Sequence, residues 1–173
     1  MKHSLLILYS WFIRTILFFF PDIQVFMRFR GWLYGLAMKK CGKDFQVTHD
    51  AIIRDVRNIS VGRNCYVGNH SVLMGSGHIV LGDEVIIAPH VVIISGNHSL
   101  QHGSFRHGSA DSGVIEIGSG SWVASNSTIQ RNSKLPKSSV LSANSFLNKI
   151  YEEPYSLYGG VPAKYIKMLK DND

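Results

Sequence analysis

Three of the eight histidines lie close together in a polar, glycine-rich stretch, which makes it the first place to look for chemistry. His98 opens the stretch 95–113, and His102 and His107 follow within it. An imidazole has an unperturbed pKa of about 6.5, so it is largely neutral yet basic at physiological pH and can act as a general base. A metal site is the alternative, but no Cys lies nearby and the closest carboxylate is Asp111. Because a glycine-rich loop is a poor preformed cage for a metal, we expect a base here and no metal.

The elements that position this stretch follow a period of six residues. Neither an α-helix, with 3.6 residues per turn, nor a strand, with a period of two, gives a repeat of six. A chain with one flat strand and one corner per repeat does, and three such repeats close a triangular coil. The aliphatic positions of the repeat are Val61, Val67, Leu73, Ile79, Leu81, Ile87, Ile93, Ile117, Val123, Ile129, Leu135, Leu141 and Leu147.

Small residues accompany the aliphatic ones. A glycine, alanine or serine usually follows the aliphatic residue, and in the second half of the chain a serine stands four residues after it. We expect these small residues at the corners, where a larger side chain would crowd the next coil. The serines are Ser121, Ser127, Ser133, Ser139 and Ser145.

Two interruptions of the period divide the chain. The pattern Ile-x-aliphatic-Gly recurs at 59–62, 79–82 and 115–118, so its copies are 20 and 36 residues apart. Twenty residues make one 18-residue coil and a two-residue bulge, whereas the wider gap also holds the stretch 95–113, which we interpret as an excursion loop. The sequence therefore predicts a mainly β chain with a helical segment at 1–45, a parallel β-helix at 46–150, and an extension with a short helix at 151–173.

The excess of positive charge is confined to the N-terminal segment. The net charge is +6; residues 1–43 contain seven Lys or Arg and a single acid, Asp22, while residues 44–173 contain eleven of each sign. A protein that binds nucleic acid would carry positive charge on the folded body that contacts phosphate, so we expect no nucleic-acid partner. The two cysteines, Cys41 and Cys65, give no disulfide framework and favour a reducing, cytoplasmic compartment.

The same segment is strongly apolar over residues 5–20. A signal peptide needs an uninterrupted apolar stretch, and a spanning helix needs about 20 apolar residues, but Arg14 interrupts this stretch and Pro21 ends it. Residues 23–43 then mix aromatic and basic side chains, as segments in the headgroup layer of an anionic membrane do. Two interpretations stay open: contact with the inner face of the cytoplasmic membrane, or capping of one end of the core.

Together these features resemble the hexapeptide-repeat acyltransferases, and more narrowly the branch of galactoside, maltose and polysaccharide O-acetyltransferases. The resemblance covers residues 59–168. Besides the repeat, it is carried by Leu-Gly-Asp-Glu-Val-Ile-Ile-Ala-Pro at 81–89, Gly-Asn-His at 96–98, Ile-Gly-x-Gly-x-Trp at 117–122 and Gly-Gly-Val-Pro-Ala-Lys at 159–164. It implies a left-handed coil, a homotrimer with active sites between subunits, and transfer of an acetyl group from acetyl-CoA to a sugar or a lipid-linked glycan of a surface polysaccharide.

The resemblance also implies roles for single residues. His98 corresponds to the general base, Asn97 orients the substrate or the imidazole, and Trp122 walls the active site. Asn69 and His70 are expected to contact the acceptor. For the coenzyme A moiety, the resemblance implies backbone contacts and one phosphate contact, at Ala124, Ser142, Ala143 and Lys164.

Three other functions remain open at this point. The same fold and base could acetylate the amine of an amino sugar nucleotide. A solenoid that has lost catalysis could serve as a scaffold, although a scaffold needs neither His98 nor the 159–164 motif. A zinc enzyme like carbonic anhydrase would need three well-placed histidines, and the spacing of the loop histidines argues against it.

Overall fold

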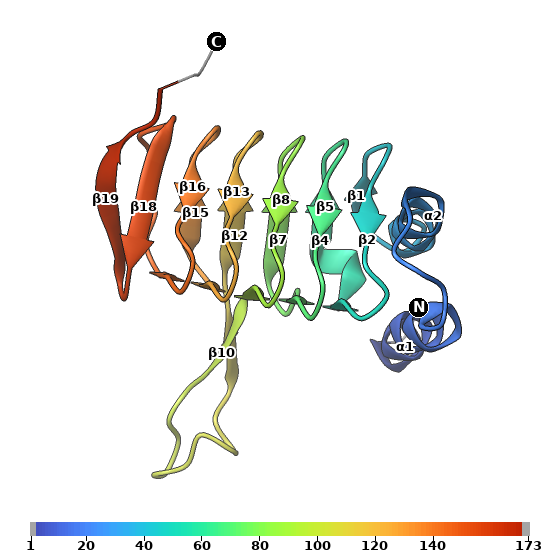
Figure 1. Cartoon of the computed structure of the whole chain (residues 1–173). Coiled ribbons are helices and arrows are strands. Elements are labelled where there is room, and N and C mark those ends of the chain that lie inside the picture. The colour runs from blue at the N-terminus through green and yellow to red at the C-terminus, as the bar shows by residue number, and fades with distance from the viewer. Residues whose placement is uncertain (1–2, 171–173) are drawn as a thin grey trace.

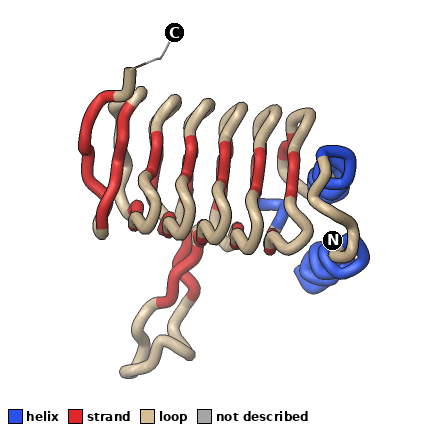
Figure 2. Tube along the Cα trace, in the orientation of Figure 1, coloured by secondary structure: helices blue, strands red, loops and turns tan. Residues whose placement is uncertain are grey.

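The computed structural model describes residues 3–170, which form a parallel β-solenoid of about six turns with two helices across one end (Figure 1). The chain visits three sheets in turn, and short strands alternate with loop corners along each coil (Figure 2). The helices are α1 (His3–Leu17) and α2 (Gln24–Gly35), and a 3-10 turn spans Val56–Asn58.

Each sheet stacks one strand from successive coils. Sheet A contains β1 (Lys40–Cys41), β4 (Ile59–Val61), β7 (His78–Leu81), β12 (Val114–Ile117) and β15 (Ser133–Leu135). Sheet B contains β2 (Gln46–Val47), β5 (Tyr66–Val67), β8 (Ile86–Ile87), β13 (Trp122–Val123), β16 (Val140–Leu141), β18 (Ser156–Gly160) and β19 (Ala163–Met168). Sheet C contains β3 (Ile52–Arg54), β6 (Val72–Met74), β9 (Val92–Ile94), β14 (Thr128–Gln130) and β17 (Phe146–Leu147). The first coil thus begins at Lys40, slightly before the expected Gln46.

The core confirms the period of six. All thirteen aliphatic positions of the repeat point inward and are at most 2% exposed. Each coil places these side chains directly over those of the coil before, as in the register Val67 to Ile87 and Leu73 to Ile93. The solenoid is therefore held by one continuous apolar column, which three short strands per coil could not supply separately.

The five serines confirm the expectation of small corner residues and explain why the residue is serine. All five are buried, and each hydroxyl donates to a backbone carbonyl, such as Ser121 to Pro136 and Ser127 to Ser142. The Ser121 hydroxyl also accepts the N–H of Ser139, one coil further on. The serines therefore satisfy backbone groups that the corners leave without a strand partner.

The two-residue bulge lies in the corner between sheets C and A. It appears as the 3-10 turn in one coil and as Gly75–Gly77 in the next, whereas a later coil passes directly from Gln130 to Ser133. The excursion loop leaves from the same corner. It forms an arm with two antiparallel strands, β10 (Gly96–His98) and β11 (Ala110–Ser112), that projects away from the solenoid (Figure 1).

The expected C-terminal helix is wrong. Residues 156–168 form the antiparallel strands β18 and β19, joined by a turn at Val161 and Pro162. Gly160, the last residue of β18, has a φ of +101°, which suits a glycine. The open edge of the last coil explains the difference, because β18 pairs with β16 and β19 pairs with β18. Backbone groups at that edge find partners only if the chain continues as strand.

The two helices cap the other end, as one of the two interpretations expected. Leu6, Ile13 and Leu17 of α1 and Tyr34 of α2 join the apolar core. Arg30 is buried beneath them and donates to Asp22 at 2.8 Å and to carbonyls of the chain between the helices. Within residues 3–170 no helix combines the length and hydropathy that crossing a bilayer requires.

Candidate active site

Asn69 and His70 lie at the corner between sheets B and C, in a cluster with two carboxylates. The Asn69 side-chain amide donates to Asp22 Oδ2 at 3.0 Å and to Asp50 Oδ1 at 3.2 Å. The His70 ring contacts Asp50 Oδ2 through Nδ1 at 3.1 Å, and the His70 backbone N–H donates to Asp50 Oδ1. His49 joins the cluster through Nδ1, which lies 2.7 Å from Asp22 Oδ2. The corner therefore presents amide, imidazole and carboxylate groups together, a set that suits the hydroxyls of a sugar.

Asp22, His49 and Asp50 are the members of this cluster that the sequence did not single out, and Asp22 is the most distant of them in sequence. It lies between α1 and α2 and reaches the corner across 47 residues of sequence, so no local motif marks it. The available signal is that it is the single acid within residues 1–43. Burial raises the pKa of Asp22, but hydrogen bonds from His49 and Asn69 outweigh this and hold the pKa below its ordinary value. Asp22 is therefore a fixed negative charge at the edge of the cluster.

His70 is held in place from two sides. Its backbone adopts φ +56°, which the corner requires, and its ring packs on that of His90 one coil further on, with centroids 4.8 Å apart. Its side chain is nevertheless 60% exposed. An exposed ring on a rigid corner can contact a ligand without a rearrangement.

The predicted coenzyme A residues lie farther along the same corner. Ala124 follows β13 and Ser142 follows β16, and the Ser142 hydroxyl donates to the Tyr158 carbonyl at 3.0 Å. Ala143 is the exposed residue next to Ser142. This row of corner residues ends at the β18–β19 hairpin, where Lys164 pairs with Gly159. The structure therefore aligns Asn69, His70, Ala124, Ser142, Ala143 and Lys164 along one edge of the solenoid.

Trp122 lies beside this edge on the outer face of sheet B. It is half-exposed and is in register with Ile86 on one side and Val140 on the other. Tyr66 and Leu157 extend the row. This row of side chains forms an apolar surface along one side of the edge.

His98 lies on the arm, at the end of β10 and opposite Ala110 of β11. Its imidazole is exposed and makes no hydrogen bond or ion pair with residues 3–170, so both nitrogens are free to meet a substrate. Asn97 precedes it and points to the opposite face of the strand, because side chains alternate along β10. Asn97 can thus contact a substrate more readily than it can orient the His98 ring.

One chain does not bring all these residues together. The arm leaves the corner between sheets C and A, whereas Asn69, His70 and the coenzyme A residues line the corner between sheets B and C. Within one chain, His98 and the predicted coenzyme A residues therefore belong to different corners of the solenoid. His102 and His107 stay on the distal part of the arm, and residues 3–170 contain no group of three or more potential ligands arranged to hold a metal ion.

Comparison with known proteins adds independent information. No family model matches the chain. The galactoside O-acetyltransferase of Escherichia coli is 30% identical over 116 residues, which are 67% of this chain and 57% of that protein. The chain thus spans less than two thirds of the length of this curated relative.

Two solved structures share the fold. A maltose O-acetyltransferase of Clostridium difficile superposes with a TM-score of 0.83 at 20% identity, covering 97% of this chain and 88% of the other. A hexapeptide-repeat acetyltransferase of Vibrio cholerae, complexed with acetyl coenzyme A, superposes with a TM-score of 0.80 at 22% identity, covering 97% and 89%. With its repeat, its solenoid and this set of relatives, the chain is similar to the hexapeptide-repeat acetyltransferases of the galactoside and maltose type.

Proposed function

We propose that this protein transfers an acetyl group from acetyl-CoA to a sugar hydroxyl, and that it works as a left-handed β-helix trimer. The observation that carries the proposal is the single solenoid edge, with the Asn69 and His70 cluster toward one end and Lys164 at the other. One end suits a polar acceptor, and the other suits the phosphates of coenzyme A. The relatives named above, which act on galactosides and maltose or bind acetyl-CoA, support this assignment.

The chemistry follows from the groups present. His98 removes the proton from the acceptor hydroxyl while that oxygen attacks the thioester carbonyl carbon, forming the C–O bond. The tetrahedral intermediate collapses, the C–S bond breaks, and the imidazolium returns its proton to the departing thiolate. The edge of the adjoining subunit aligns the two substrates, which supplies much of the rate enhancement in reactions of this kind.

The surface-polysaccharide acceptor and the location at the inner face of the cytoplasmic membrane are the finer parts of this proposal. Their support is the apolar, basic segment 1–43, which would keep the enzyme close to a lipid-linked glycan. A further support is that the arm projects from the solenoid (Figure 1) and that His98, at the end of its first strand β10, is exposed, so that a large acceptor can reach it.

The decisive experiment measures release of the coenzyme A thiol by the purified protein with acetyl-CoA and a panel of sugars, with products identified by mass spectrometry. Transfer to galactosides, maltose or glucose supports the proposal. Transfer to amino sugar nucleotides alone assigns N-acetylation instead. If no acceptor releases thiol and acetyl-CoA does not bind, the protein is a scaffold.

A further inference from the structure

The outward side of α1 is mainly apolar: Ser4 and Thr15 are polar, but it has no Asp, Glu, Lys or Arg. Leu5, Leu8, Trp11, Phe12 and Ile16 are each about half exposed, between 49% and 56%. They lie on the side of the helix opposite the residues that enter the core. A helix on the surface of a soluble protein ordinarily carries polar residues on this side, so α1 lacks the partner that its outward side requires.

The outward side of α2 repeats the pattern. Val25, Phe29, Trp32 and Leu36 follow the helical spacing of four, three and four residues, and Trp32 stacks on Phe29 with ring centroids 5.8 Å apart. Phe19, which is 88% exposed, lies in the connection between the helices. Figure 1 shows α1 and α2 side by side across the end of the solenoid, so both outward sides face away from it. We call these outward residues of α1 and α2, with Phe19, the end face.

Basic side chains border the end face. Arg28, Lys39, Lys40 and Lys43 are exposed, and of these only Arg28 has an ion pair with a described residue, at 3.3 Å from Asp44. The segment that forms the end face carries the whole net charge of +6. Apolar and aromatic residues with a basic border match the composition of helices that lie in the interface of anionic membranes.

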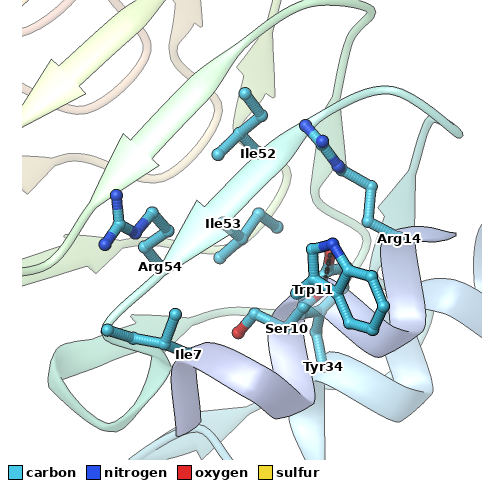
Figure 3. Close-up of a pocket in the computed structure, with 8 residues that line it drawn as sticks. All are labelled: Ile7, Ser10, Trp11, Arg14, Tyr34, Ile52, Ile53 and Arg54. Atoms are coloured by element: carbon cyan, nitrogen blue, oxygen red, sulfur yellow. Dashed lines mark hydrogen bonds between the residues drawn. The ribbon is translucent and has the colours of Figure 1, made fainter. Parts of the chain in front are cut away.

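A pocket beside the end face adds a second observation. It has a volume of about 340 Å³ and lies between α1 and β3, with Arg14 and Arg54 on opposite sides (Figure 3). Neither arginine has an ion pair within residues 3–170. Ser10, which lines the pocket, is 95% buried, and its hydroxyl has no hydrogen-bond partner among the described residues. Two guanidinium groups and a hydroxyl without a hydrogen-bond partner are groups that can bind a phosphate.

We propose that the end face docks on an anionic phospholipid bilayer and that the Arg14–Arg54 pocket receives a lipid phosphate. With the apolar side of α1 sunk about 5–10 Å into the bilayer, the opposite side of the helix lies at the level of the headgroups. The pocket is on that side, and Trp11 borders both the pocket and the end face.

Charge argues for a bilayer rather than a second copy of the chain. A twofold contact would place the end face of one chain against the same face of another, which would bring the two basic borders together. Like charges across such a contact oppose association, whereas an anionic leaflet attracts them.

Docking would also place the active site at a defined height. The strands β3, β6 and β9 stack from the helices toward the arm, so the arm begins about two strand spacings, roughly 10 Å, beyond the helical layer. A helix about 10 Å across whose apolar side is sunk about 5–10 Å into the bilayer adds at most about 5 Å, so the root of the arm stands roughly 10–15 Å above the bilayer. This height suits a glycan attached to a membrane lipid, a point that rests on the proposed function.

Vesicle flotation of the full-length protein tests the proposal. We expect it to float with vesicles of phosphatidylcholine and phosphatidylglycerol, and to bind vesicles of phosphatidylcholine alone far more weakly. Trp11→Ser combined with Trp32→Ser should weaken binding at least about tenfold, because two half-exposed aromatic side chains no longer enter the interface. The control is Ile166→Ser with Met168→Ser, since both residues are comparably exposed on β19 at the other end of the solenoid.

A second pair of variants tests the pocket. Arg14→Gln with Arg54→Gln should weaken binding to the anionic vesicles by more than Lys149→Gln with Lys167→Gln, which removes the same charge at exposed positions of the solenoid. Equal losses would assign Arg14 and Arg54 to general electrostatic attraction and overturn the pocket part of the proposal.

Absence of flotation overturns the docking proposal. So does a lipid-free particle whose mass halves on Trp11→Ser with Trp32→Ser, since a second copy would then cover the end face. Thiol release with a soluble acceptor is measured in parallel. The tryptophan variant should keep that activity, so failure of docking and failure of the proposed function give different results.

Discussion

His98 is the residue on which turnover should depend most. Replacing it by Ala removes the proposed general base, so we expect kcat to fall about 100-fold or more. The side chain is exposed and makes no hydrogen bond or ion pair with a described residue, so thermal unfolding should change little. His102→Ala is the matched control on the same arm. The assignment is wrong if His102→Ala loses activity and His98→Ala keeps it.

Asn69 and Lys164 should separate the two substrates. Asn69→Ala removes an amide from the acceptor cluster and should raise KM for the sugar, whereas Lys164→Ala should raise KM for acetyl-CoA, each by about tenfold. Steady-state kinetics with each substrate varied in turn measures both values. If the two variants affect the same KM, the solenoid edge is not divided as we propose.

Asp22 should make stability depend on pH in the acidic range. Its pKa is lowered in the folded protein by its hydrogen bonds to His49 and Asn69, against the effect of burial, so the carboxylate is bound more tightly by the folded state. Its stabilisation is therefore present above the ordinary aspartate pKa of about 3.9 and is lost as pH falls through the lowered value. Thermal unfolding from pH 6 to pH 2 should show a smaller decline for Asp22→Asn than for the unchanged protein.

The sequence allows the positions of some residues of the candidate site to be predicted, but not of others. His98 stands directly after a regular repeat, so its position on an exposed arm could be predicted. Asp22 could not, because its partners His49 and Asn69 lie 27 and 47 residues away and the turn between α1 and α2 determines the contact. Its pKa likewise depends on neighbours that only the fold brings together.

The elements follow from the repeat wherever one coil resembles the next. An aliphatic residue every six positions predicts the stacked strands, because each inward side chain needs the same neighbour above and below. The two ends of the solenoid break this regularity. The β18–β19 hairpin was predicted as a helix because the need to pair the open edge of β16 is a property of the last coil and not of the local sequence.

Gly118 tests the close approach of successive coils. A Cβ built on it would lie 2.3 Å from the backbone nitrogen of Lys137 in the next coil, so a methyl group cannot fit without separating the coils. We expect Gly118→Ala to lower the free energy of unfolding by about 1–3 kcal/mol. Ala124→Ser is the control, because Ser142 occupies the same corner one coil later. Equal unfolding midpoints in urea would contradict this account of the corner.

The solenoid is a narrow prism, so it has a large surface for its volume. Part of its apolar surface therefore lies outside the core. Tyr66, Ile86, Trp122, Val140 and Leu157 form an apolar row across sheet B. Side-by-side association of prisms would cover such rows. It would also bring the arm of one chain to the edge of the next, which separate corners prevent within a single chain.

Mixed trimers test whether the active site lies between subunits. His98→Ala chains keep an intact edge, and chains with both Asn69→Ala and Lys164→Ala keep an intact arm. With both substrates well below their KM values, each variant alone should have about one hundredth of the activity of the unchanged protein or less. After unfolding and refolding together in equal amounts, half of the edges and half of the arms are intact, so about one quarter of the interfaces should combine the two in a cyclic trimer. We therefore expect activity to recover to about a quarter of that of the unchanged protein, measured as thiol release, while the two variants refolded separately and then mixed recover none. Failure to recover, in particles whose mass is that of a trimer, would put the complete active site within one chain and would require the arm to fold back onto its own solenoid.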